Sequence, residues 1–531
     1  MGLVALLACS AGPADSVTET DTSAPGAASA LVPLEAPRLL RRISLDLLGA
    51  LPEPSELDAV EADPAALDAI VDGYLHDERF EERLVALFAE HFQTRISEFE
   101  TRYYDYHLDD EDEFPFERSV ADEPLRLAAR IVADDRPWSD LVTADHTMAN
   151  ELLAEVWPLD RDEGEGWQPA RWTDGRPAAG VLASNGLWWR HQSTPSNKNR
   201  RRAAMTIRLL LCEDLLSRPV TLSGGLDLTA EIDDAIWDQP SCTGCHVTVE
   251  PLAAALFGFY WFSQYNQQEM TSYHPERELL GPDELGVEPA WFGQPIGGLA
   301  DLGGVIADDA RFPRCAAETM ATLLWRRPVE SDDFDVVEAL RQVYIDEGGG
   351  SHALLEAVLA TDRYRAGDLA DDATDAELDR ELTTRMLSPE QLAAAAEDWT
   401  GFRWTYGAFD QLSNDEWGYR VLAGGVDGEE VTAPQADPSL SWALVTKRMA
   451  QATAQAAVDE GIVDADLSPG SEAFRAQLED LHWQLYAERP TDAWLEASEQ
   501  LWSDALALSD ADTAATTVVS ALLRDTRYVT Y

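Results

Sequence analysis

The sequence is poor in basic residues and in cysteine. Only 39 Lys and Arg stand against 98 Asp and Glu among 531 residues, so the formal net charge is −59. The net charge therefore disfavours nucleic acid and anionic membrane surfaces as partners, because both are negatively charged. Such a surface suits saline surroundings, where salt screens the self-repulsion. Hydrophobic residues still make up 45% of the chain, with 17 Trp, so we expect a large folded core.

Several functional sequence patterns are also missing. No phosphate-binding loop, Ser-His-Asp arrangement or metalloprotease motif stands out. With 98 acids, almost any spacing of two carboxylates occurs by chance, so carboxylate pairs carry no information. The sequence therefore leaves open whether the protein is an enzyme. After the first residues, no apolar run is long enough to cross a bilayer.

The N-terminus has the pattern of a bacterial lipoprotein signal. An apolar run from Leu3 to Ala8 ends at Cys9, and a small residue before Cys is typical of a lipoprotein cleavage site. Residues 10–30 are rich in Ser, Thr, Ala, Gly, Pro and acids, as in a flexible tether. We expect lipidation of Cys9 and a lipid anchor in the bacterial outer membrane as the sole membrane contact, with a periplasmic or surface-facing body. The alternative is an ordinary unstructured N-terminus. Because no Lys or Arg precedes the run, we favour a start codon further upstream.

Helical periodicity dominates the rest of the chain. Apolar spacing predicts helices over residues 39–48, 65–88, 203–216, 316–324 and 388–399. The last one opens with Ser388-Pro389-Glu390-Gln391, a capping box with Pro at the first helical position. Strand patterns are sparse. We expect a mainly α, multidomain protein with few short strands. Its predicted segments are a signal remnant and tether (1–30), an N-terminal helical domain (31–175), a central domain (176–370) and a C-terminal helical domain (371–531).

One pattern occurs three times, in residues 42–80, 323–364 and 485–528. Each copy has a Pro turn after a helix and ends on Leu-x-x-x-Arg followed by an aromatic residue: Phe80, Tyr364 and Tyr528. The Pro breaks the first helix, and the terminal Leu and aromatic ring can pack back on it. We therefore expect repeated helical hairpins. The unequal spacing argues against a true solenoid.

The central segment carries the strongest chemical motif. Residues 240–246 read Pro-Ser-Cys-Thr-Gly-Cys-His, in which Cys242, Cys245 and His246 have the spacing that attaches a c-type haem. Two thiols would reach the porphyrin vinyl groups, and the adjacent imidazole would bind the iron. A zinc half-site is disfavoured because no second Cys or His pair lies at finger spacing. A redox disulfide between the two cysteines is disfavoured because no thioredoxin-like strand–helix unit surrounds it.

The remaining cysteines are Cys212 and Cys315. Both are left over once Cys9 is assigned to lipid and the other two to haem, so they could form a disulfide in an oxidising compartment. Each could equally be a small buried apolar residue.

Two further features bear on a haem site. The sixth iron ligand is not readable: candidates are Met148, His146, Met270, His274 and Met320. We expect Met320 in the core and His274 in a solvated loop. The only dense basic stretch, residues 198–202, could pair with haem propionates or with an acidic patch on another domain, and the second is favoured.

Several stretches together resemble one family: the exported cytochrome-c-associated multidomain proteins of planctomycete type and of myxobacteria, whose function is unknown. The stretches are residues 42–57, 141–150, 180–189, 240–246, 312–315 and 327–328. After the Cys-x-x-Cys-His motif the family shows a turn pair and a Gly, and here Glu250-Pro251 and Gly258 stand in those places, with Glu instead of the usual Asp. The resemblance covers roughly residues 38–365. It implies a mostly helical, exported architecture and a covalent haem, and no known reaction.

These observations support one main hypothesis and two rivals. The first is an exported lipoprotein with a single covalent haem c on Cys242, Cys245 and His246, acting in electron transfer or as the redox component of an assembly, with a partner protein that the sequence does not identify. The second is a haem-free helical scaffold or interaction lipoprotein with a Cys242–Cys245 disulfide. The third is an enzyme with an open haem position.

Overall fold

The structure is a computed structural model. It describes residues 31–96, 106–218, 236–237, 240–261, 267–369, 374, 385–407, 409–414, 418–435 and 437–531. Cys9 and the predicted tether lie outside the described residues, so lipidation stays a prediction. None of the helices in these ranges has the length and apolar character that a membrane crossing requires.

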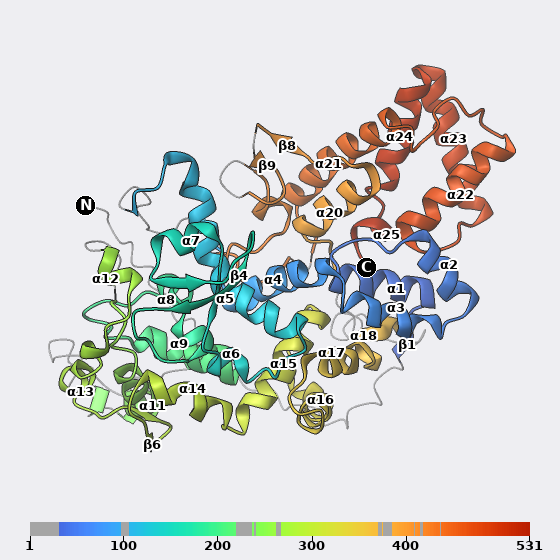
Figure 1. The fold of residues 1–531 in the computed structure, drawn as a ribbon. Coiled ribbons are helices and arrows are strands. Elements are labelled where there is room, and N and C mark those ends of the chain that lie inside the picture. Colours follow the sequence, from blue (N-terminus) through green and yellow to red (C-terminus); the bar gives the residue numbers. More distant parts are fainter. Residues whose placement is uncertain are drawn as a thin grey trace, which may run out of the picture.

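Helices form most of the described chain, which confirms the mainly α prediction (Figure 1). The first third contains α1 (Ala36–Leu47), α2 (Pro54–Ala62), α3 (Ala66–Tyr74), α4 (Glu78–Phe92), α5 (Glu113–Ala133), α6 (Asp140–Thr143) and α7 (Glu151–Val156). The middle contains α8 (Asn185–Arg190), α9 (Arg200–Leu211), α11 (Pro240–Ala254), α12 (Gln267–Thr271), α13 (Leu280–Leu285), α14 (Leu299–Ala307), α15 (Arg311–Trp325), α16 (Phe334–Asp346), α17 (Ser351–Leu359) and α18 (Asp362–Arg365). The last part contains α20 (Pro389–Thr400), α21 (Leu440–Asp459), α22 (Glu472–Tyr486), α23 (Asp492–Leu508), α24 (Ala511–Leu522) and α25 (Thr526–Val529).

The strands are short and form small antiparallel sheets. They are β1 (Leu31–Pro33), β2 (Thr147–Ala149), β3 (Leu159–Arg161), β4 (Gln168–Trp172), β5 (Ala290–Trp291), β6 (Gln294–Pro295), β7 (Ala366–Leu369), β8 (Thr405–Tyr406) and β9 (Phe409–Asp410). The pairs are β1 with β7, β5 with β6 and β8 with β9, and the three-stranded sheet has the order β2-β4-β3. In the β1–β7 pair, Leu31 lies opposite Leu369, so the first described residues are tied to the end of the middle segment.

Local sequence signals explain where helices begin. The Ser388 hydroxyl accepts a hydrogen bond from the Gln391 N–H at 3.2 Å, and the Gln391 side chain accepts one from the Ser388 N–H at 2.8 Å, so the predicted capping box is confirmed. The single helix predicted over residues 65–88 is wrong. It is split into α3 and α4 because the Asp77 carboxylate accepts from the Arg79 N–H at 2.9 Å and starts a new helix.

Apolar side chains gather in two main cores. The larger core takes residues mainly between Leu39 and Tyr364, from both predicted segments 31–175 and 176–370, and also includes Trp483 and Ala487 of the C-terminal segment. The second lies mainly between Leu387 and Val529 and includes Leu45 of α1. Helix α1 therefore contributes to both cores, and the predicted domain boundaries stay predictions.

The three sequence repeats are present as helical units. The first runs from α1 to the start of α4, the second from α15 to α18, and the third from α22 to α25. Two helices, instead of the single one of a simple hairpin, follow each Pro turn before the chain reaches the terminal aromatic residue. Phe80, Tyr364 and Tyr528 are each at most 1% exposed, so all three rings are packed inside, as expected.

Buried polar groups on α1 connect the ends of these units. The Asp46 carboxylate accepts hydrogen bonds from the hydroxyls of Tyr364 at 2.9 Å and Tyr531 at 2.7 Å. The Arg41 guanidinium donates to the carbonyl oxygen of Tyr528 at 2.7 Å, and that of Arg42 to the carbonyl oxygen of Tyr364 at 2.7 Å. Figure 1 shows the result, with α1 lying beside α25 and α18 although these helices are far apart in the sequence.

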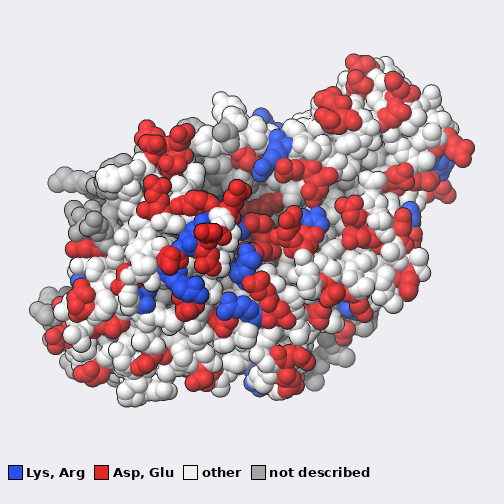
Figure 2. Space-filling model, viewed as in Figure 1, with Lys and Arg blue, Asp and Glu red and all other residues white. Residues whose placement is uncertain are grey.

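The scarce basic residues are not spread evenly. Figure 2 shows acidic side chains over the whole visible face, whereas Lys and Arg gather near its centre.

One cluster of charged residues is buried around Asp122 of α5. The Asp122 carboxylate accepts a hydrogen bond from Arg95 Nε at 2.7 Å and lies 3.2 Å from Arg118 Nε. Burial alone would raise the pKa of Asp122, but the two guanidinium groups outweigh it and lower the pKa to about 2.

This cluster gives a prediction for acid stability. The folded pKa of Asp122, about 2, lies below its ordinary value of 3.8, so its ionised form stabilises the fold above pH 4 and this contribution is lost as the pH falls towards 2. Asp122→Asn should lower the free energy of unfolding at pH 7 by about 2 kcal/mol or more. The difference from the unmodified protein should shrink between pH 4 and pH 2 in chemical denaturation followed by circular dichroism. Asp68→Asn, at an exposed position, is the matched control. An Asp122→Asn effect of equal size at both pH values would contradict the assignment.

Candidate functional site

The Cys-x-x-Cys-His motif lies in the first half of α11. Residues three and four apart on a helix are neighbours, so Cys242, Cys245 and His246 share one side of it. Both cysteines are free thiols and half-buried, and the His246 side chain is 27% exposed. The second half of α11 is anchored in the larger core, where Leu252 is fully buried. The three predicted ligands therefore project from a fixed helix at its accessible end.

A buried carboxylate orients the imidazole of His246. Its Nδ1–H donates to Glu250 Oε1 at 2.5 Å, and Arg200 Nε on α9 donates to the same oxygen at 2.6 Å. Glu250 is 1% exposed; burial alone would raise its pKa, but the hydrogen bonds from His246 and Arg200 leave that pKa below its usual value. Because Nδ1 carries the donated proton, Nε2 is the ring nitrogen that can bind a metal.

The basic stretch 198–202 therefore pairs within the chain. Arg200 contacts Glu250, and Lys198 Nζ lies 3.9 Å from a Glu284 carboxylate oxygen. Arg202 is fully buried and donates to the carbonyl oxygen of Tyr260 at 2.7 Å. The sequence reasoning offered haem propionates or an acidic patch as partners, and it missed that one of these arginines supports the motif histidine itself. The His-x-x-x-Glu spacing on one helix was the available signal.

The sequence candidates for a sixth ligand lie in different surroundings. Met148, Met270 and Met320 are at most 6% exposed, and Met320 belongs to the larger core, as predicted. His274 lies in a loop, as expected, but its ring is only 20% exposed and packs edge-on against Tyr260 at 4.9 Å between centroids. His146 Nδ1 lies 3.1 Å from an Asp145 carboxylate oxygen. The structure does not select a sixth ligand.

The donor set on α11 fits a covalent c-type haem. Haem attachment requires two reduced thiols and one imidazole whose metal-binding nitrogen is free. Cys242 and Cys245 are free thiols, and His246 is held by Glu250 through its other ring nitrogen. A metal ion bound by protein side chains alone is a poorer fit. In the part of the chain that the structure describes, no three or more His, Cys, Asp or Glu side chains converge as a metal site.

Gly258, another position singled out in the sequence, allows close packing beside this helix. A Cβ at Gly258 would lie 2.2 Å from the ring of Tyr273, so only glycine permits that ring to pack there. The Tyr273 hydroxyl donates in turn to Glu278, just before α13. The segment after α11 is thereby held against the core.

Cys212 and Cys315 form a disulfide with a sequence separation of 103 residues. Cys212 directly follows α9 and Cys315 is in the second turn of α15. The bond therefore ties together the two ends of the segment that contains α11. Arg200, which supports Glu250, is on α9, so the disulfide also fixes one partner of the motif.

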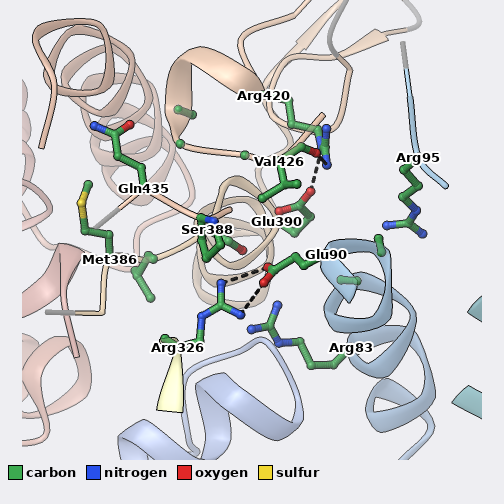
Figure 3. Close-up of a pocket in the computed structure, with 17 residues that line it drawn as sticks. Arg83, Glu90, Arg95, Arg326, Met386, Ser388, Glu390, Arg420, Val426 and Gln435 are labelled. Carbon is green, nitrogen blue, oxygen red and sulfur yellow. Dashed lines mark hydrogen bonds and ion pairs between the residues drawn. The ribbon is translucent and has the colours of Figure 1, made fainter. Parts of the chain in front are cut away.

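A second cluster of charged residues lies where α4, α15 and α20 meet (Figure 3). Arg326 forms two hydrogen bonds with the Glu90 carboxylate, at 2.8 and 2.9 Å, and Arg420 Nε donates to Glu390 at 2.9 Å. Burial opposes ionisation of Glu390, but Arg420 lowers its pKa to about 2. These two ion pairs lie around a cavity of only about 30 Å³, which Arg83 and Arg95 also line. The pairs join helices, and the cavity has no room for a ligand larger than water.

Comparison with known proteins gives one match. Residues 27–150 match the family described as "PSCyt2: Protein of unknown function (DUF1549)", a planctomycete-type cytochrome-c-associated domain. No curated protein and no solved structure matches the chain. The matched stretch contains α1 and the first repeat, and α11 lies outside it.

The disulfide yields a stability prediction. Closing a loop of about 100 residues stabilises a fold by up to about 4.7 kcal/mol in the chain-entropy model, and removal of a native disulfide typically costs about 2–5 kcal/mol. Replacing both Cys212 and Cys315 by Ser should lower the melting temperature measured by calorimetry, and a reducing agent should have the same effect on the unmodified protein only. If reduction leaves the unmodified protein's melting temperature unchanged, the pairing is contradicted.

Proposed function

We propose that the protein is an exported redox protein that carries one covalent c-type haem on α11 and acts in electron transfer or as the redox component of a larger assembly. The observation that carries the proposal is the arrangement of Cys242, Cys245 and His246 on one accessible side of α11, with both thiols free and the imidazole held by Glu250. When bound, a haem would supply a one-electron redox centre.

The cysteines would attach the group without any change of oxidation state. Each thiol adds across one vinyl group: the sulfur bonds to one vinyl carbon, and a proton is taken up by the other. No atom is lost and no oxidant is consumed, but both sulfurs must be reduced. The free thiols of Cys242 and Cys245 meet this condition.

His246 would provide the axial nitrogen ligand of the iron, and the residues around it would affect the electron density at that nitrogen. The Glu250 carboxylate holds the Nδ1 proton, which makes the imidazole more electron-rich at Nε2. Arg200 in turn keeps Glu250 ionised and in place. This chain of contacts fixes the ring orientation before any ligand binds.

The proposal places the protein on a lipid anchor outside the cytoplasm. It rests on the Leu6-Leu7-Ala8-Cys9 pattern and on the Cys212–Cys315 disulfide, because disulfides persist in oxidising compartments. A strongly acidic surface also favours a redox partner with a basic docking face.

Haem attachment can be tested by spectroscopy and mass. Protein produced in a host with a cytochrome c maturation system should show a Soret band and an intact mass increased by one haem. Cys242→Ala and Cys245→Ala should each lose one of the two thioether bonds, and the double variant should lose covalent haem altogether. The matched control is the Cys212→Ser, Cys315→Ser double variant, which removes the other two cysteines and should keep the haem. A colourless, unmodified product from the unmodified sequence would leave the haem-free helical scaffold as the function.

The role of Glu250 gives a separate prediction. Glu250→Gln keeps a hydrogen-bond acceptor of the same size but removes the negative charge next to the imidazole. The loaded variant should therefore have a higher reduction potential in a spectroelectrochemical titration, because the oxidised centre loses electrostatic stabilisation. Glu338→Gln on α16 removes an acid that is 57% exposed and contacts Arg341 instead. This control should leave the potential near that of the unmodified protein. Equal potentials in all three proteins would show that Glu250 does not act on the axial histidine.

A further inference from the structure

A cavity of about 420 Å³ lies between α4, α9, α15 and the segment 432–434. Its lining is mixed: Leu323, Pro328, Ala433 and Pro434 contribute apolar surface, and Gln93, Thr319 and Thr322 contribute polar groups. Glu90, Arg326 and Pro434 also line the small cavity of Figure 3, so the Glu90–Arg326 pair stands between the two spaces. A cavity of this size and lining can hold a small organic molecule.

Among the charged groups that line this cavity, one arginine has no ion-pair partner in the described residues. Arg326 is paired with Glu90, and Arg327 is paired with Asp333 at 2.8 Å. Burial lowers the pKa of His91 to about 4, so its ring is neutral at pH 7. Arg208 on α9 remains. No Asp or Glu of the described ranges forms an ion pair with it, and its contact is a neutral one, from Nη2 to Gln93 Oε1 at 3.0 Å.

Arg208 also has unused hydrogen-bonding capacity. Its Nε is buried and has no hydrogen-bond partner among the described residues. A buried donor without a partner is unfavourable, so the Nε–H of Arg208 can donate a hydrogen bond to a ligand in the cavity. Burial moreover lowers the pKa of Arg208, and the charge of Asp214 offsets this only in part.

We propose that this cavity binds a small amphipathic anion, an organic carboxylate or a similar acid with an apolar body, whose charged group pairs with Arg208. The apolar residues of α15 and of the segment 432–434 would cover the body of the ligand. The Cys212–Cys315 disulfide supports the site, because Arg208 lies one turn before Cys212 and the Thr319 hydroxyl lies 3.7 Å from Cys212 Sγ. The site needs no haem, so it stands or falls independently of the function proposed above.

Two fluorescent probes that share the same aromatic rings but differ in charge separate the contribution of the ligand's charge to binding from that of its apolar body. They are 8-anilinonaphthalene-1-sulfonate, which is anionic, and N-phenyl-1-naphthylamine, which is neutral. The unmodified full-length protein should bind the anionic probe saturably with one site. Arg208→Gln should weaken that binding by about ten-fold or more, the loss of one charge-assisted hydrogen bond, and change binding of the neutral probe by less than about two-fold.

Two further variants control for position and charge. Thr322→Phe fills the cavity and should weaken both probes. Arg171→Gln removes an exposed arginine, with a side chain that is 56% exposed, and should weaken neither. The proposal is overturned by the absence of saturable binding of the anionic probe, by equal losses of both probes in Arg208→Gln, by the same loss in Arg171→Gln, or by unchanged binding in Thr322→Phe.

Discussion

Three charged side chains on α1 hold together parts of the chain that are hundreds of residues apart. Asp46 is completely buried and bonds to Tyr364, Arg385 and Tyr531, while Arg41 and Arg42 donate to carbonyl oxygens at the ends of the third and second repeats. Burying charges is costly unless every one is paired or hydrogen-bonded. Burial lowers the pKa of both arginines only to about 10, so they stay cationic at neutral pH. The second and third repeats therefore both end beside α1, at Tyr364 and Tyr528.

This junction lies away from the helix that contains the Cys-x-x-Cys-His motif. Figure 1 shows α11 at the opposite end of the molecule from α22 to α24. Between them, α9 and α15 connect the two regions, and the Cys212–Cys315 disulfide fixes their relative position. On helix α9, Arg200 donates to Glu250, the partner of the motif histidine, and Arg208 lines the separate cavity. Helix α9 thus contributes a residue to both proposed sites. The disulfide at its C-terminal end restrains the position of both residues.

Features that depend on neighbouring residues could be predicted from the sequence, whereas contacts between distant segments could not. The capping box at Ser388, the Pro turns of the repeats and the Cys-x-x-Cys-His spacing depend on neighbouring residues, so they were predictable. The break at Asp77 was missed because apolar periodicity continues across it. Glu250 was recognisable as the residue four after His246, but its second partner, Arg200, comes from 50 residues earlier. The Arg208 cavity is lined by four separate segments, and no single stretch indicates it.

The central claim is that Cys242 and Cys245 hold a haem whose iron is bound by His246. Proteolytic digestion of natively exported protein, followed by tandem mass spectrometry of the peptide that contains residues 240–254, tests it most directly. The account predicts that this peptide carries one haem and that neither of its sulfurs reacts with an alkylating reagent. A peptide of unmodified mass, with both thiols open to alkylation or joined in a disulfide, would contradict it.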